Sequence, residues 1–490
     1  MRMNDTDQIE TLKALTEVKR ERAHPRKGQR LASVRVSPGS YLAAASVLTF
    51  ASALLLRSEQ ELLALGVVGV AWLLIPALAF TDRIEFDGKV LSRRGPAPFL
   101  QRLIAGREKQ LRIEDFEKVD TQALRTLRRR GRVRYRYRTQ VVGKNAEFTF
   151  ASGGRSYREM IRQLLPLIHQ DKLDLRTLEL RDYLCDPRDL NREVEGLHLA
   201  SADVLDSATL DFKLGGKKQR LEKGGEDATP TADATATSAR AILLGALGNK
   251  LRIAGRLNQA REAFRRALLI NPGDGRLIFE FARLLRSQAS SLSDAKLLSR
   301  ARAALRLSAM RAGNEPGLLS LIGESFLEWG ETTRAQNSFQ KAIDLEAGNY
   351  RSRMGLANLA LRDGKLAHVI HQHREAARAA SEKSLAAYAR READYYALLN
   401  DDDDYLAVEL RRINWLQHSL RIRRLAALVT NASILVALIG PYVEPSIAGF
   451  CWSLASSSLV AWIASLFMIK ILATRRGPRL EGSSGSGFEL

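Results

Sequence analysis

Histidines and clustered carboxylates are the side chains with which this chain could perform catalysis or bind a metal, and their spacing does not support either. His368 and His371 would share one helix face but His373 would not, so the three do not form the ligand set of a zinc site. The acidic run Asp401–Asp404 lacks the spacing of a calcium-binding loop. No Walker loop, GxGxxG, GxSxG or HExxH motif occurs. We therefore predict no catalytic residue, no metal and no cofactor, and we expect a binding protein rather than an enzyme.

The charge of the chain points instead to binding of anions, because the formal net charge is +21. Such an excess favours nucleic acid, acidic proteins or an anionic lipid surface as partners. In one predicted strand basic residues alternate with Val133, Tyr135 and Tyr137. The arginines of its other face are Arg132, Arg134, Arg136 and Arg138.

This basic face has two main interpretations. It could contact anionic lipid headgroups, where each basic residue contributes about 1 kcal/mol, or it could be an ordinary solvated face of a sheet. RNA is disfavoured as a partner, because the alternating tyrosines should point into the core and away from any base-stacking surface.

A repeated helical pattern occupies residues 240–400. A pattern of glycine, alanine, an aromatic residue and alanine recurs at a spacing of roughly 34 residues. One copy contains Leu244, Leu247, Gly248, Leu251, Gly255, Ala260, Phe264, Ala267 and Pro272, and a later copy contains Leu319, Ile322, Gly323, Phe326, Gly330, Ala335, Phe339 and Ala342. A third copy surrounds Gly364, and a degenerate copy between the first two requires an insertion near Gln288–Ser293. The stretch resembles the tetratricopeptide repeat (TPR) family, which implies a solenoid of helix pairs with a concave groove.

In the TPR family the first helix of each pair lines the groove, and this resemblance identifies candidate partner-binding residues. They are Asn249, Arg252, Arg276, Arg283, Arg286, Asn358 and Arg362. Asn and Arg at these positions resemble part of the carboxylate-binding arrangement of peptide-binding TPRs, although Glu324 and Glu328 dilute the charge. The resemblance implies a protein partner that presents an acidic or C-terminal peptide. The alternatives are a groove solvated by ordinary charges and a groove filled by a larger partner.

Four apolar runs lie near the two ends of the chain. They are Tyr41–Leu56, Leu62–Phe80, Leu425–Val443 and Ile447–Leu472. A helix needs roughly 20 apolar residues to cross a bilayer, and we expect two transmembrane hairpins, at 39–80 and 425–472. Lys and Arg gather beside the outer ends of the runs, so the positive-inside rule places both termini and the soluble domains in the cytoplasm. No charged residue lies in the middle of a run, which weighs against a transporter.

Alternating residues at 82–169 predict several antiparallel strands followed by a helix. This order resembles the bacterial PH-like domain, which implies a small barrel or sandwich used for contacts at a membrane or with proteins. The remaining expected segments are a basic cytoplasmic N-terminal segment at 1–38, a linker at 170–238 that is flexible after about 213, an amphipathic helix at 401–424 that leads into the membrane, and a flexible tail at 473–490.

The predicted fold class is therefore mainly α: a TPR-type helical solenoid plus a small PH-like β domain, with four transmembrane helices in two terminal hairpins. We expect a multi-pass protein of the bacterial inner membrane that acts as a scaffold or adaptor and recruits a protein partner. Anionic lipid and a second copy of the chain are further candidate partners. One alternative is a structural subunit of a translocation or polysaccharide-export complex, packed against polytopic membrane subunits. The other is a membrane-tethered RNA-binding protein.

Overall fold

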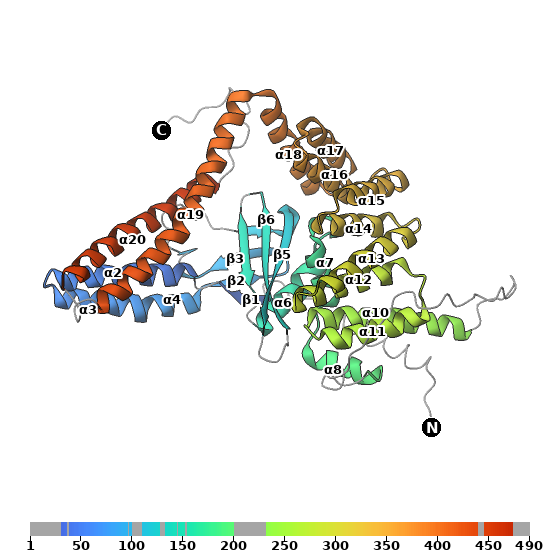
Figure 1. The fold of residues 1–490 in the computed structure, drawn as a ribbon, viewed down its shortest axis with the longest axis horizontal. Helices are drawn as coiled ribbons and strands as arrows, with labels where there is room; N and C mark the ends of the chain where they lie inside the picture. Colours follow the sequence, from blue (N-terminus) through green and yellow to red (C-terminus); the bar gives the residue numbers. More distant parts are fainter. Residues whose placement is uncertain are drawn as a thin grey trace.

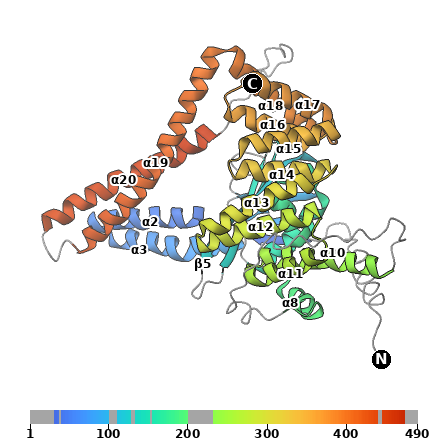
Figure 2. The same cartoon turned by 45° about the vertical axis from the view of Figure 1, so that its right-hand side comes forward.

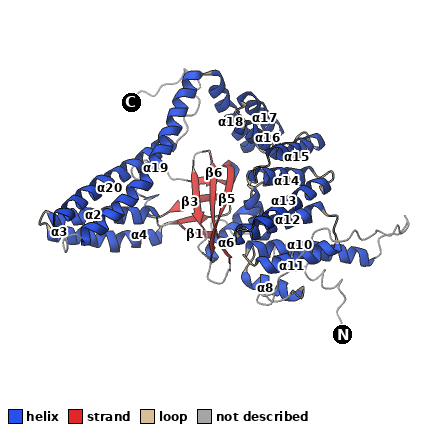
Figure 3. Cartoon of the chain, in the orientation of Figure 1, coloured by secondary structure: helices blue, strands red, loops and turns tan. Residues whose placement is uncertain are grey.

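Three groups of elements make up the molecule: apolar helices, a set of strands and a helical solenoid (Figures 1 and 3). The computed structural model describes residues 31–36, 39–96, 98–99, 110–127, 133–144, 146–151, 154–199, 232–439 and 445–473. Most of the expected basic N-terminal segment, Arg132, the segment expected to be flexible after about 213 as far as residue 231, and the tail after 473 lie outside the described residues.

The strands form two antiparallel sheets. The first has the order β1-β2-β3-β4 and the second the order β5-β6-β7. Their bounds are β1 Ala32–Arg35, β2 Arg83–Phe86, β3 Val90–Arg94, β4 Gln110–Arg112, β5 Phe116–Leu127, β6 Val133–Gly143 and β7 Glu147–Ala151. Alternate residues of these strands are buried in one core, as the period of two predicts.

Strand β1 was not expected, because it lies inside the segment predicted as a basic N-terminal region. It pairs with β2 so that Ala32 faces Phe86 and Arg35 faces Arg83. The chain therefore leaves the sheet after β1, passes through the first pair of apolar helices, and returns beside its starting point as β2. The β unit begins at Ala32 rather than at residue 82.

Helix α6 (Arg155–Leu164) covers the strands with Tyr157, Met160, Ile161 and Leu164, all of them buried. The first part of the predicted linker at 170–238, whose fold the sequence left unassigned, contains two short helices. Helix α7 (Leu175–Tyr183) and helix α8 (Pro187–Gly196) follow a short 3-10 turn (Gln170–Lys172), and they bury apolar side chains against the β unit and the solenoid. Asp174 caps α7 by accepting the Thr177 amide at 3.0 Å.

The solenoid stacks antiparallel helices from α10 to α18, with the strands behind them in Figure 2. Their bounds are α10 Ala232–Ile253, α11 Leu257–Ile270, α12 Gly275–Leu292, α13 Ala295–Arg311, α14 Pro316–Glu328, α15 Thr332–Leu345, α16 Tyr350–Arg362, α17 Leu366–Ala379 and α18 Lys383–Asp401. The extra residues near Gln288–Ser293 lengthen α12 instead of forming a loop.

Close packing within the helix pairs explains the repeated glycine and phenylalanine. A Cβ atom at Gly248 would lie 2.6 Å from the Phe264 ring, and one at Gly323 would lie 2.6 Å from the Phe339 ring. Both rings are completely buried. Because these pairs recur at the positions that the pattern predicts, the solenoid is a TPR-like helical repeat.

Apolar helices from the two ends of the chain lie side by side (Figures 1 and 2). The N-terminal set is α2 (Gly39–Arg57), followed by α3 (Glu61–Gly69), a π-helical turn (Val70–Leu74) and α4 (Ile75–Thr81). The C-terminal set is α19 (Asp403–Ile439), one long helix that begins next to the solenoid, and α20 (Pro445–Ala473). The Phe50 and Trp452 rings join the two sets, with their centroids 6.2 Å apart.

Two helices, not the expected four, meet the length and hydropathy of a membrane span within the described residues. They cover Glu61–Thr81 and Gly449–Ala473. The apolar run Tyr41–Leu56 is shorter than the roughly 20 residues that a span requires, and the description of α19 stops at Ile439. The sequence pattern therefore overestimated the number of helices that qualify on length and composition.

Candidate functional site

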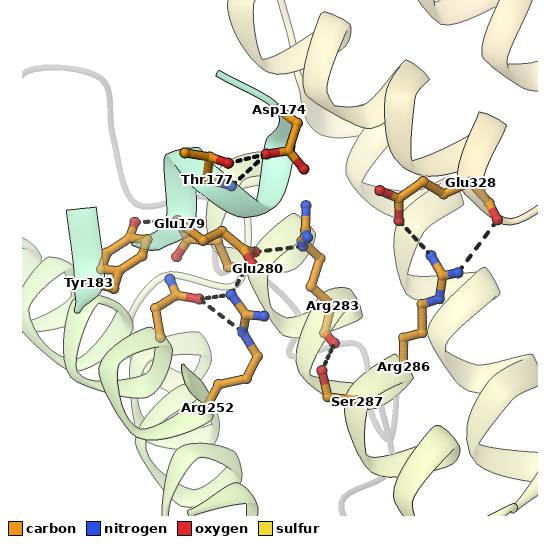
Figure 4. Close-up of polar contacts among 11 residues, drawn as sticks. Asp174, Thr177, Glu179, Tyr183, Arg252, Glu280, Arg283, Arg286, Ser287 and Glu328 are labelled. Atoms are coloured by element: carbon orange, nitrogen blue, oxygen red, sulfur yellow. Dashed lines mark hydrogen bonds and ion pairs between the residues drawn. The ribbon is translucent and has the colours of Figure 1, made fainter. Parts of the chain in front are cut away.

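The inner face of the solenoid holds a segment of the same chain, helix α7. Glu179 of α7 lies between two solenoid arginines: its Oε1 accepts from Arg252 Nη2 at 2.6 Å and lies 2.7 Å from Arg283 Nε. Figure 4 shows the arginines reaching from the solenoid toward the carboxylate. The three side chains are 15%, 8% and 10% exposed. Burial raises the pKa of Glu179, but the two arginines outweigh it and the pKa is lowered overall.

A second acidic side chain lies on the solenoid side of this contact. Glu280 accepts a hydrogen bond from Tyr183 of α7 at 2.9 Å. Burial raises the pKa of Glu280 to about 6, although Tyr183, Asn249 and nearby arginines oppose the shift. The carboxylates of α7 and α12 are thus each matched to a partner on the other element, and α7 is held by charge as well as by apolar packing.

Further contacts join the β unit to the solenoid along its length. Tyr137 of β6 donates to the Ile253 carbonyl oxygen at 3.0 Å. Arg351 of α16 donates to the Leu173 carbonyl oxygen at 3.0 Å, and Arg391 of α18 pairs with Glu117 of β5 at 2.6 Å. The β unit therefore spans the concave face from α10 to α18.

The predicted groove residues divide into two groups by their surroundings. Asn249, Arg252 and Arg283 belong to the contact with α7, where Asn249 Oδ1 accepts from Arg252. Arg286 pairs with Glu328 at 3.1 Å, and its guanidinium lies 4.8 Å from the Trp329 ring centroid. The exposed candidates are Arg276, Asn358 and Arg362. The structure therefore brings Asn249, Arg252, Arg283 and Arg286 together, whereas Arg276 is exposed on α12. Asn358 and Arg362 lie on α16, where Arg362 donates to the Leu327 carbonyl oxygen at 3.3 Å.

The basic strand corresponds to β6. Arg136 and Arg138 are exposed, Tyr135 and Tyr137 are half-buried, and Tyr135 packs against the solenoid core. The tyrosine face thus points inward, but toward the solenoid as well as toward the β unit. Arg136 and Arg138, on the opposite face of the strand, are directed away from the contact with the solenoid.

The histidine cluster does not form a metal site within the described part of the chain, where no group of three or more potential ligands is found. His373 is buried and stacks on Tyr396, with 5.7 Å between the ring centroids. Burial lowers the pKa of His373, which favours the neutral ring. His368 and His371 are exposed.

A cavity of about 240 Å³ lies between α7 and the strands on one side and α10, α12 and α14 on the other. Its charged lining consists of Arg176, Glu179, Arg252, Arg283, Arg286 and Glu328. Sequence reasoning missed the α7 contribution, because it treated residues 170–212 as an unassigned linker. The amphipathic pattern of Leu173–Leu184 signalled a helix, but no local pattern identifies the surface on which such a helix docks.

The fold and this contact define a TPR-like helical-repeat protein whose concave face holds its own β unit. No protein-family model matches the chain, and no curated protein matches it. One matching solved structure is described as the crystal structure of the APC/C hetero-tetramer Cut9–Hcn1. The match has 13% sequence identity and a TM-score of 0.26, and it covers 64% of this chain and 52% of that chain. This chain thus spans about half the length of that protein, and the TM-score is too low to support a functional argument.

Proposed function

We propose that this protein is a membrane-anchored scaffold whose solenoid binds acidic protein segments on its concave face. The observation that carries the proposal is the burial of Glu179 between Arg252 and Arg283, because in this contact two groove arginines bind a carboxylate presented by a helix of the same chain. Arg252 and Arg283, which make this contact, are two of the groove residues that the TPR resemblance selects. Binding rather than catalysis is the function that this geometry supports.

Apolar surface on the terminal helices supports the anchoring part of the proposal. Leu62 and Leu73 are 90% and 77% exposed, and Leu428 and Phe467 are 68% and 65% exposed. Exposed apolar surface on this scale is typical of contact with lipid or another protein. Since β1 and β2 are paired at the base of the first hairpin, both ends of that hairpin lie on the side of the β unit.

The second pair of apolar helices would enter the membrane from the same side. Helix α19 starts beside α18 of the solenoid, and Arg412 near its start bonds to the Leu472 carbonyl oxygen near the end of α20. Charge asymmetry in the sequence supports a cytoplasmic location for this side, and the resemblance to the bacterial PH-like domain supports a bacterial cell. Arg136 and Arg138, both exposed, are the candidates for contact with anionic headgroups.

The exposed groove residues are the proposed entry point for a client. Asn358 and Arg362 lie on α16, beyond the α7 contact, and both are accessible. An acidic segment of a client would pair with them first and could then compete with α7 for Arg252 and Arg283. This order follows from accessibility, since the two buried arginines are already paired with Glu179.

Site-specific photocrosslinking in intact cells tests the proposal. A photoreactive residue is placed at Asn358, at Arg362 and, as a control, at Gln336, an exposed residue of α15. The expected result is the same membrane-associated client from both groove positions and none from position 336. A chain recovered without detergent from the soluble fraction, or adducts that are identical at all three positions, would contradict the proposal.

A further inference from the structure

The cavity between α7 and the solenoid carries more positive charge than its own acidic residues neutralise. Its lining contains Arg176, Arg252, Arg283 and Arg286 against Glu179 and Glu328, an excess of two positive charges. Glu280 lies outside the lining, where its charge acts on Arg276 and Arg252. Arginines that lack enough acidic partners in a partly buried cavity favour the binding of an anion.

Arg283 shows where the anion would bind. Its side chain is 10% exposed and its Nε is paired with Glu179. Its Nη1 is buried and has no hydrogen-bond partner among the described residues. Burial lowers the pKa of Arg283, and Arg252 and Arg176 lower it further while Glu179 and Glu328 oppose them. Because a buried guanidinium N–H without an acceptor is costly, a bound acceptor would stabilise this arrangement.

The shape of the cavity limits the ligand to a small one. Strand β6 and helix α7 form one wall, and α10, α12 and α14 form the other, so the space between them suits a small ligand. Its volume is about 240 Å³, whereas about 10–15 Å³ on the same measure holds one water molecule. One tetrahedral oxyanion with a small substituent and a few water molecules therefore fits.

We propose that this cavity binds a small phosphate-type dianion, either free phosphate or a phosphoester, held by Arg176, Arg283 and Arg286. A dianion matches the two excess positive charges, and phosphate oxygens accept the paired N–H groups of a guanidinium. The bound anion bridges α7 to α12, so it holds the β unit on the concave face. This binding requires neither membrane anchoring nor a protein client, although Arg283 is also one of the arginines for which a client is proposed to compete.

Equilibrium dialysis of the full chain in detergent with radiolabelled inorganic phosphate tests the proposal, with ionic strength held constant by chloride. The expected result is saturable binding of one phosphate per chain. Arg283→Gln should weaken it by about ten- to a hundredfold, since one charge-assisted interaction is lost. Glu179 keeps Arg252 in this variant, so the α7 contact has a remaining partner.

Arg306→Gln is the matched control. Arg306 pairs with Glu331 away from the cavity, is 45% exposed, and shares Glu331 with Arg334 and Arg302. This variant loses one arginine from a shared glutamate, as Arg283→Gln does, and it should bind phosphate as the unchanged protein does. Equal loss of binding in both variants would contradict the proposal.

A readout that needs no variant is hydrogen exchange of the α7 amides in the unchanged protein. Saturating phosphate should slow their exchange, while α20 stays unchanged. Competition by glycerol phosphate, a dianionic phosphomonoester, identifies a soluble phosphomonoester as the natural source, and phosphate binding that glycerol phosphate does not compete with identifies free phosphate. Absence of saturable binding up to about 10 mM phosphate, a weak affinity by any standard, or unchanged α7 exchange would overturn the proposal.

Discussion

Replacing Glu179 by glutamine tests whether charge holds the β unit on the solenoid. The substitution keeps the size of the side chain but removes the counter-charge of Arg252 and Arg283, whose side chains are 8% and 10% exposed. Removing one partner of a buried ion pair costs about 3–5 kcal/mol. Glutamine still offers one acceptor oxygen, so the expected cost is at the lower end, about 3 kcal/mol.

Hydrogen exchange followed by mass spectrometry measures this effect. A loss of about 3 kcal/mol corresponds to roughly a hundredfold faster exchange of the amides whose opening requires α7 to detach. The affected segments are α7 and the facing parts of α10 and α12, whereas α20 should be unchanged. The effect has a pH dependence of known sign: the lowered pKa of Glu179 means that its stabilisation is present above the ordinary glutamate pKa of 4.5 and is lost as the pH falls through the folded value.

The control is the equivalent substitution at Glu331, another buried carboxylate paired with arginines. Glu331 is 13% exposed, but its partners Arg302, Arg306 and Arg334 are 45–49% exposed and can return to water. Glu331→Gln should therefore cost less than about 1 kcal/mol. If Glu179→Gln costs no more than Glu331→Gln, apolar packing alone holds α7, and the electrostatic reasoning is refuted.

Three further predictions concern the helix pairs, the cap of α7 and the apolar helices. Gly248→Ala should destabilise the first repeat by about 1–3 kcal/mol because the new methyl group meets Phe264. Gly317→Ala should cause no such loss, since no atom lies within 4 Å of a methyl group at that position. Chemical unfolding followed by fluorescence compares the two variants. Burial raises the pKa of Asp174 from 3.8 to about 6, so the stability that Asp174 contributes is present at low pH and is lost as the pH rises through about 6. Asp174→Asn should flatten this pH dependence, which the hydrogen exchange of the α7 amides measures. An unchanged pH profile in the variant would refute the prediction. Val460→Arg, at a position 66% exposed in α20, should oppose membrane insertion by about 2.5–3.5 kcal/mol and reduce the carbonate-resistant fraction, while Lys470→Arg should leave that fraction unchanged.

Local periodicity was sufficient to predict most of the helices and strands. Gly248 with Phe264 and Gly323 with Phe339 identified the helix pairs, because close helix contact requires a small residue opposite a large one. Long apolar runs identified α3–α4 and α20 for a similar reason, since the length of a run and its hydropathy are properties of a single segment. Both kinds of signal lie within one repeat or one helix.

Contacts between distant segments were not predictable in this way. Strand β1 has four residues and lies in a basic segment, so its sequence alone does not predict a strand. It forms one by pairing with β2, which follows the first hairpin. Helix α7 could be suspected from Leu173–Leu184, but the partner of Glu179 is Arg252, 73 residues away. No period in the sequence links two residues at that separation.

The sequence by itself determined which segments are helical repeats and which are apolar enough to leave water, and the TPR resemblance selected the candidate groove arginines. Only the tertiary structure decided what those arginines contact, because Arg252 and Arg283 are equally suited to a client's carboxylate and to that of Glu179. Docking of α7 settles the choice, since a segment of the same chain does not pay the translational entropy that a separate partner loses on binding.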